Sequence, residues 1–164
     1  MNMIESLITE FEHETQTTRK HLARVPNDKL DWRPHEKSFT TGGLASHITD
    51  LNRFTDLIFN SDEFDFDPAT FKPFKATSVP DLLQTFDDNV ARAKQTLRAV
   101  SEETVWAPWR FKVMGRLLFE RPRAAAFRDF TLSHQIHHRG QLSVYLRLLN
   151  VPVPSTYGPT ADES

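Results

Sequence analysis

The residues best suited to do chemistry are two histidines near the C-terminal end, His134 and His138, in segment 133–141. They are four positions apart in what the pattern predicts to be a long helix. Residues four apart lie on one helix face, with Cβ atoms about 5–6 Å apart. At that separation two imidazoles can bind one metal ion through bonds of about 2 Å. A metal site is therefore the first hypothesis for function.

A third histidine strengthens this hypothesis. His47 lies between Leu44 and Leu51 on an apolar helical face, just as His134 and His138 lie on the apolar stripe of their own segment. Imidazoles inside a helical bundle need partners, because an unpaired buried polar group costs about 1–3 kcal/mol. A shared ion would satisfy one nitrogen of each. Three inward histidines on two helices can form a His₃ set with positions left open for water or substrate.

The other four histidines are expected outside this set. His137 is turned about 100° away from His138, so it should face solvent, a partner subunit or a carboxylate. His13 and His21 fall off the main apolar stripe of their segment and are expected on the surface. His35 lies in a loop, where a surface position is also expected.

Several residue types narrow the chemistry further. The residue after the first histidine of the pair is Gln135, so the glutamate base of an H-E-x-x-H metallopeptidase is missing. The chain has no cysteine, which excludes disulfides, thiolate ligands and a thiol nucleophile of its own. Gln141 and Tyr145, one and two turns beyond His138, are candidates for lining a pocket, although helix packing explains them equally well. No catalytic acid or base can be assigned.

Long amphipathic helices are the elements that must position these residues. Four segments have apolar residues at helical spacing, and they cover residues 3–25, 39–60, 79–100 and 122–150. Pro26 ends the first, and Ser78 with Asp81 resembles a capping box ahead of the third. Helices about 30 Å long match the dimensions of a four-helix bundle. The predicted fold class is therefore all-α, a four-helix bundle with a long connection between its second and third helices.

The segments between and after these helices are less regular. Residues 61–77 are rich in Asp, Pro and Phe and are expected to form a loop, whereas partial alternation within 101–121 allows a short strand or hairpin. The proline-rich residues 151–164 cannot continue a helix and are expected to form a tail. No linker or repeat divides the 164 residues, so we expect one domain over 1–164.

The charge and hydropathy of the chain exclude some classes of partner. The formal net charge is −2, which gives neither the basic surface typical of nucleic-acid binding nor a polybasic patch for membranes. No apolar run approaches the roughly 18 residues of a membrane span. The N-terminal residues lack a basic region followed by an apolar one. A cytoplasmic location is therefore expected.

The order of these motifs resembles the DinB-like (YfiT-like) family of metal-binding four-helix-bundle proteins over essentially the whole chain. The loop Trp32-Arg33-Pro34, followed by Ser38 and by His47 within 44–48, resembles the family's first ligand region. Segment 134–141 resembles the second ligand region, and the tail 153–163 resembles the family's ending.

The resemblance implies a site and a class of activity. It implies that His47, His134 and His138 bind one divalent ion, with zinc, nickel or iron preferred. Bonds of about 2.0–2.1 Å would bring their nitrogens within about 3–4 Å of each other. Characterised relatives include metal-dependent transferases and isomerases that use a low-molecular-weight thiol such as bacillithiol or mycothiol. The favoured hypothesis is a thiol-dependent transferase with a small-molecule substrate; a metal-dependent hydrolase and a non-catalytic, stress-related metal- or ligand-binding bundle remain open.

The resemblance is also the main reason to expect a homodimer formed through helix faces. Gly140 would allow close approach of two helices, because it has no side chain. His137 and Arg139 are turned away from the metal face and are the other residues expected near such an interface.

Overall fold

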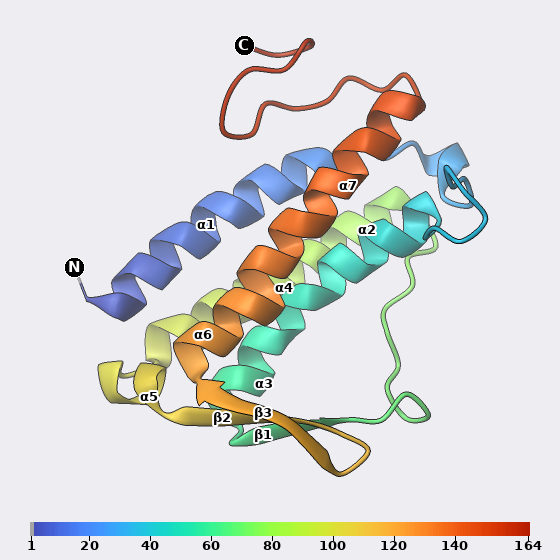
Figure 1. Ribbon diagram of the computed structural model, residues 1–164. Helices are drawn as coiled ribbons and strands as arrows, with labels where there is room; N and C mark the ends of the chain where they lie inside the picture. Colours follow the sequence, from blue (N-terminus) through green and yellow to red (C-terminus); the bar gives the residue numbers. More distant parts are fainter. Residues whose placement is uncertain (1) are drawn as a thin grey trace.

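The computed structural model describes residues 2–164 and is mainly helical, with a small sheet at one side (Figure 1). The long helical stretches lie side by side as a bundle and are α1 (Met3–Leu22), α2 with α3 (Thr41–Asp50 and Phe54–Asn60), α4 (Val79–Ala99), and α6 with α7 (Arg123–Phe127 and His134–Leu148). The predicted helical bundle is therefore confirmed. Residue 1 of the expected 1–164 domain lies outside the described residues.

The ends of the helices follow from local chemistry. The Asn2 side chain accepts a hydrogen bond from Glu5 N, and Glu5 in turn accepts from Asn2 N, which caps α1. Ser78 caps α4 by accepting from Asp81 N, whereas the Asp81 carboxylate accepts from Thr77 N, one residue earlier than in a capping box. The first helix ends at Leu22 instead of residue 25, since a residue followed by proline disfavours the helical conformation.

The second and fourth helices are both interrupted. Thr40 caps α2, so this helix starts at Thr41, two residues later than expected, and a 3₁₀ turn at Leu51–Arg53 separates it from α3. The fourth helix contains a π-helical segment, Arg128–Ser133, directly before α7. Single π-turns inside helices are frequent at functional sites, and this one sets the position of the first residue of α7, His134.

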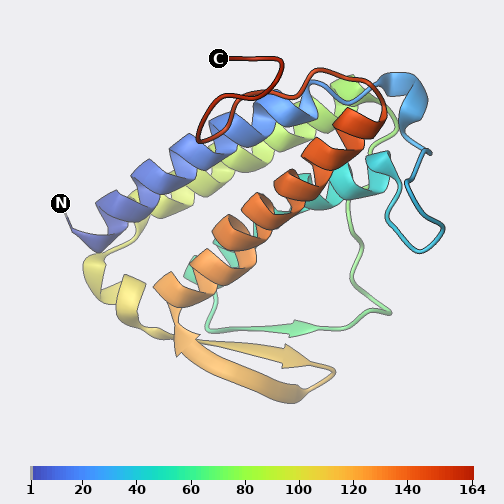
Figure 2. The ribbon, with the colours of Figure 1, turned by 45° about the horizontal axis from the view of Figure 1, so that its top comes forward.

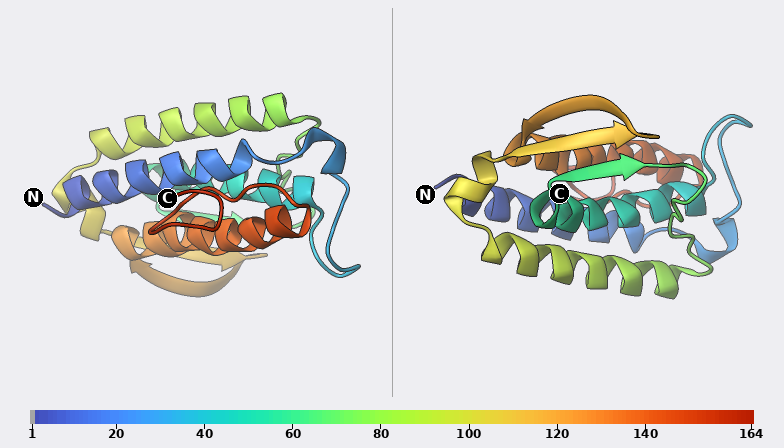
Figure 3. Two further views of the ribbon diagram at one scale, coloured as in Figure 1. Left: turned by 90° about the horizontal axis from the view of Figure 1, so that it is seen from above. Right: turned by 90° about the horizontal axis from the view of Figure 1, so that it is seen from below.

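The sheet has three short strands, β1 (Glu63–Phe66), β2 (Pro108–Val113) and β3 (Arg116–Pro122), in the order β1-β2-β3. The β2–β3 hairpin confirms the hairpin considered for residues 101–121, which also contain the short helix α5 (Glu102–Trp106). The expectation that 61–77 is entirely loop is wrong, because β1 pairs in parallel with β2. Local patterning could not show a pairing between segments so far apart in the chain. The sheet runs beneath α3 and α6, as the view from below shows (Figure 3).

The C-terminal residues do not form a free tail. They fold back over α1 and α7 (Figures 1 and 2). The Asp162 carboxylate accepts hydrogen bonds from Arg147 and from Val153 N, and Glu163 forms an ion pair with Arg24 at 2.7 Å. Charged side chains therefore anchor a segment that proline prevents from continuing α7.

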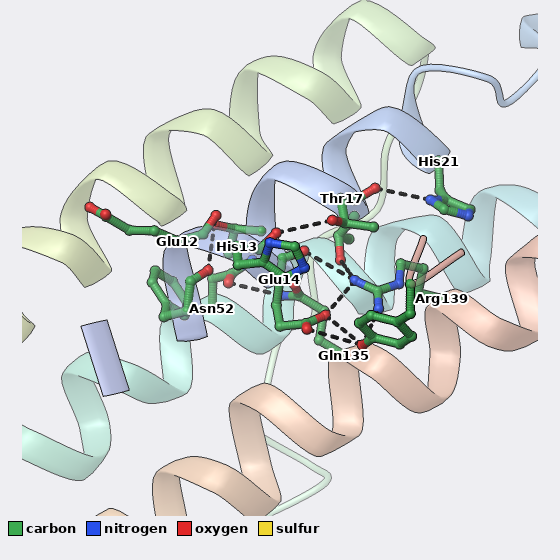
Figure 4. A network of polar contacts seen from close by, with 12 residues as sticks. Glu12, His13, Glu14, Thr17, His21, Asn52, Gln135 and Arg139 are labelled. Atoms are coloured by element: carbon green, nitrogen blue, oxygen red, sulfur yellow. Dashed lines mark hydrogen bonds and ion pairs between the residues drawn. The ribbon is translucent and has the colours of Figure 1, made fainter. Parts of the chain in front are cut away.

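Two residues that we placed on the surface or at a dimer face, His21 and Arg139, are buried in the polar network drawn in Figure 4. His21 is 1% exposed, and its Nδ1 donates to the Thr17 carbonyl at 2.9 Å. Arg139 is 2% exposed and forms an ion pair with Glu14 at 2.7 Å. Arg139 is buried because the α1 side chains Glu14 and Thr18 pair with it. His21 is buried with its Nδ1 bonded within its own helix. A search for apolar stripes detects neither of these buried polar positions.

Within residues 2–164, no helix combines the length and apolar character that crossing a membrane would require.

Candidate metal centre

Three histidines from two helices lie together in the bundle. One side-chain nitrogen from each of His47, His134 and His138 lies within 4.8 Å of the other two. The Nε2 atoms of His47 and His134 are 3.3 Å apart. In a tetrahedral site with bonds of 2.0–2.1 Å, two ligand nitrogens are separated by about 3.3 Å. The limit of 4.8 Å that encloses all three nitrogens is wider than the expected 3–4 Å.

The backbone positions these imidazoles on facing helices. His134 and His138 occupy successive turns of α7, and His47 projects from α2 opposite them. The neighbouring Gln135 is buried and donates through Nε2 to Asn52 Oδ1 at 3.0 Å, in the turn after α2 (Figure 4). This bond ties the start of α7 to the turn that directly follows α2, the helix that carries His47. Gln135 therefore has a structural role, in keeping with its inability to act as a general base.

The surroundings keep the three imidazoles neutral. Burial is the main cause that lowers the pKa of His134 to about 4, with smaller contributions from the neighbouring histidines. Burial also lowers the pKa of His47 and of His138 from the usual histidine value. Metal binding requires the unprotonated form of the ligand nitrogen. The site therefore holds its ligands in the required state at neutral pH.

The ring of His138 is oriented by a hydrogen bond to Gln141. The His138 Nδ1 lies 2.7 Å from Gln141 Oε1, and because a carbonyl oxygen can only accept, Nδ1 carries the proton. The lone pair of the neutral imidazole is then on Nε2. Such a partner on the second ring nitrogen is the usual companion of a metal-binding histidine.

Phe39 is a residue of this site that the sequence analysis missed. Its ring stacks on His47 at a centroid distance of 5.9 Å and meets His138 edge-on at 6.4 Å, yet 53% of it is exposed. The Tyr145 hydroxyl donates to the Phe39 carbonyl at 3.1 Å and so holds the loop before α2 against α7. The available signal was an aromatic residue eight positions before His47, directly after the polar residues 35–38.

Three cavities adjoin the histidine cluster. One of about 420 Å³ lies beside His138, and its wall includes Lys37, Ser38 and both pocket candidates, Gln141 and Tyr145. A second, of about 270 Å³, lies beside His47 between the loop before α2 and residues 73–76. A third, of about 280 Å³, reaches both His47 and His134 from the side of the sheet. Small molecules can therefore approach the cluster from more than one direction.

The remaining histidines do not join the cluster. His13, His35 and His137 are exposed, as the sequence predicted. His21 is buried but lies in the separate polar network between α1 and α7. In the part of the chain that the structure describes, the group His47, His134 and His138 is the candidate metal centre.

Comparison with known proteins gives a consistent assignment. The model of the DinB superfamily matches residues 10–142. The chain is 25% identical over 164 residues to "Uncharacterized protein YrdA" of Bacillus subtilis, an alignment covering 98% of this chain and 91% of the relative.

Two solved structures resemble the fold of this chain. The crystal structure of a DinB-like protein from Bacillus cereus has a TM-score of 0.75 at 21% identity and covers 93% of this chain and 97% of its own. The crystal structure of a DinB-like protein from Bacillus subtilis has a TM-score of 0.68 at 19% identity and covers 96% of this chain and 98% of its own. At such identities these two structures support the fold alone.

Proposed function

Since the chain belongs to the DinB superfamily, we propose that it binds one divalent metal ion through His47, His134 and His138 and acts as a transferase with a low-molecular-weight thiol. The observation that carries the proposal is the convergence of the three imidazoles, with two Nε2 atoms 3.3 Å apart. Without an ion, these largely desolvated imidazoles would lie against one another and lack hydrogen-bond partners for some of their nitrogens. Zinc, nickel and iron all suit imidazole ligands.

The residues present fit such an ion. Three neutral imidazoles leave the ion its full positive charge and some coordination positions for other groups. When bound, the ion supplies a charge that lowers the pKa of a coordinated thiol or water. The cavities beside the histidines favour an accessible site over a closed structural one. This supports a reactive role rather than a purely structural metal.

Other side chains of the site support a polar cosubstrate. Lys37 and Ser38 line the cavity beside His138, together with Gln141, and an ammonium group there can attract the carboxylate of a small thiol. Gln141 fixes the tautomer of His138, and Tyr145 holds Phe39 over the imidazoles. Because the chain has no cysteine, the thiol must come from a cosubstrate. The resemblance to thiol-using relatives points the same way.

The test combines metal analysis with an assay of thiol consumption. Protein purified without an affinity tag is analysed for metals, then loaded with zinc, nickel or iron and mixed with a chromogenic aryl halide and one of bacillithiol, mycothiol or cysteine. We expect turnover that needs both metal and thiol and that is lost in His138→Ala. The matched control is His137→Ala, which removes an exposed neighbouring imidazole.

Two results would argue against the proposal. Metal-dependent hydrolysis of ester or amide substrates without any thiol would show a hydrolase instead. Failure of the folded protein to bind any of the metals offered would remove the metal centre altogether.

A further inference from the structure

The cavity between the sheet and α3 has an aromatic wall, and the histidine cluster lies at one end of it. Six phenylalanines line it, and they come from α3, β1, β2, the connection after β1 and the π-helical segment: Phe54, Phe64, Phe66, Phe71, Phe111 and Phe130. His47 and His134 line the same cavity, together with Asp50, Leu51 and Pro73. The cavity therefore leads from an apolar chamber directly to two of the three imidazoles.

The acidic residue of this wall is not available to a ligand. Asp50 is buried, and its Oδ1 accepts from Arg53 at 2.9 Å while its Oδ2 accepts from Phe74 N at 2.7 Å. A charged group placed in the chamber would lose its hydration without gaining a partner from this carboxylate, which carries a large cost. The chamber thus disfavours charged ligands.

The phenylalanine rings hold the chamber open rather than filling it. Ring centroids are 5.2 Å apart for Phe66 and Phe71 and 5.0 Å apart for Phe111 and Phe130, so the rings support each other as a wall. All six rings remain only partly buried. The cavity is partly open to solvent and has a volume of about 280 Å³. An apolar cavity of about 150 Å³ is already enough to bind benzene.

Building on the proposed metal-dependent function, we propose that this chamber binds an uncharged aromatic or compact aliphatic group of the substrate. The group would occupy the space between the sheet and α3, with the reacting part of the molecule directed to His47 and His134. The polar thiol would use the opposite cavity beside His138, where Lys37 and Gln141 lie. The two cosubstrates would then be separated by chemistry as well as by position.

The test compares two ligands that differ by one ring. Propanohydroxamic acid and 3-phenylpropanohydroxamic acid share a metal-binding head and alkyl chain, and only the second carries a phenyl group. Their affinities for the zinc-loaded protein are measured by calorimetry. Burying a phenyl ring should raise affinity by about tenfold to 100-fold. This comparison uses the unmodified protein, so it does not depend on whether a variant folds.

A pair of variants then locates the ring. Phe71→Asn replaces one aromatic ring of the chamber wall by a polar side chain. Phe74→Asn is the matched control, because Phe74 lies three residues away and lines the separate cavity beside His47. The advantage of the phenyl compound should fall at least about fivefold in the first variant and persist in the second. Equal loss in both variants would overturn the assignment of the ring to this chamber.

The outcomes separate this inference from the proposed function. If both hydroxamates bind equally well to the zinc-loaded protein, the chamber proposal is wrong and the metal proposal stands. If the protein retains no zinc, the proposed function fails. Binding of 3-phenylpropanol to the metal-free protein then tests whether the chamber is a ligand-binding cavity. Saturable binding that weakens in Phe71→Asn supports an apolar ligand cavity, and absence of binding overturns it.

Discussion

Removing the metal from the loaded protein should lower its thermal stability at pH 7.5. An ion that binds only the folded state stabilises it by about 2.7 kcal/mol when its free concentration is 100 times the dissociation constant. For a chain of 164 residues, 1 kcal/mol corresponds to about 2–4 °C in Tm. A chelator should therefore lower Tm by about 5–10 °C under these conditions.

The pH dependence of this effect follows from the lowered histidine pKa values. The folded-state pKa of His134 is about 4, below the value near 6.5 of an unfolded chain. The unfolded state therefore binds more protons, and the stability that depends on this difference is present above pH 6.5 and is lost as the pH falls towards 4. Burial lowers the pKa of His47 and of His138 in the same direction.

Metal binding is affected by the same protonation. Protons compete with the ion for the imidazoles, so the chelator effect should be smaller at pH 5.5 than at pH 7.5. Because burial lowers the pKa of all three histidines, the steepest decline should fall below pH 6.5. A decline centred on pH 6.5 would contradict the burial of these rings.

Differential scanning calorimetry of three proteins provides the assay. The wild type should show the full chelator effect, and His138→Ala almost none, since two ligands hold a divalent ion poorly. His137→Ala should behave as the wild type, because this exposed imidazole lies outside the cluster. A wild type that binds none of zinc, nickel, iron, copper and manganese, and whose Tm is the same with and without chelator, would refute the metal centre.

Three further changes test other parts of the structure. Gln141→Leu removes the acceptor of His138 Nδ1 and should weaken metal binding about 10–100-fold in a chelator competition, whereas unchanged affinity would contradict an orienting role. Glu14→Gln leaves the buried Arg139 without its charged partner and should lower the free energy of unfolding in urea by about 3–5 kcal/mol; a loss below about 1 kcal/mol would contradict that coupling. We propose a homodimer through the outer face of α7, where Val144 is exposed one turn from Gly140, so Val144→Glu should give monomers in sedimentation; a monomeric wild type at micromolar concentration would disprove the dimer.

The sequence was most informative where local rules decide the structure. The apolar stripe of 79–100 and the cap at Ser78 predicted α4 almost to the residue, because periodicity and capping are properties of neighbouring residues. The four-residue spacing of His134 and His138 likewise required only helix geometry to place both on one face. The interruptions at Leu51–Arg53 and Arg128–Ser133 left no clear local signal.

Tertiary packing decided what the local pattern could not. The distance from His47 to the other two histidines depends on how α2 and α7 pack, and the burial of Arg139 depends on its ion pair with Glu14 of α1. The aromatic chamber also required the pairing of β1 with β2, which brings Phe64 opposite Phe111 from a segment far along the chain. Residue spacing along a single helix is fixed by the backbone, but contacts between distant segments depend on the packing of the whole chain. The sequence alone therefore identified the three candidate ligands, and only the folded structure showed that they converge and that cavities give access to them.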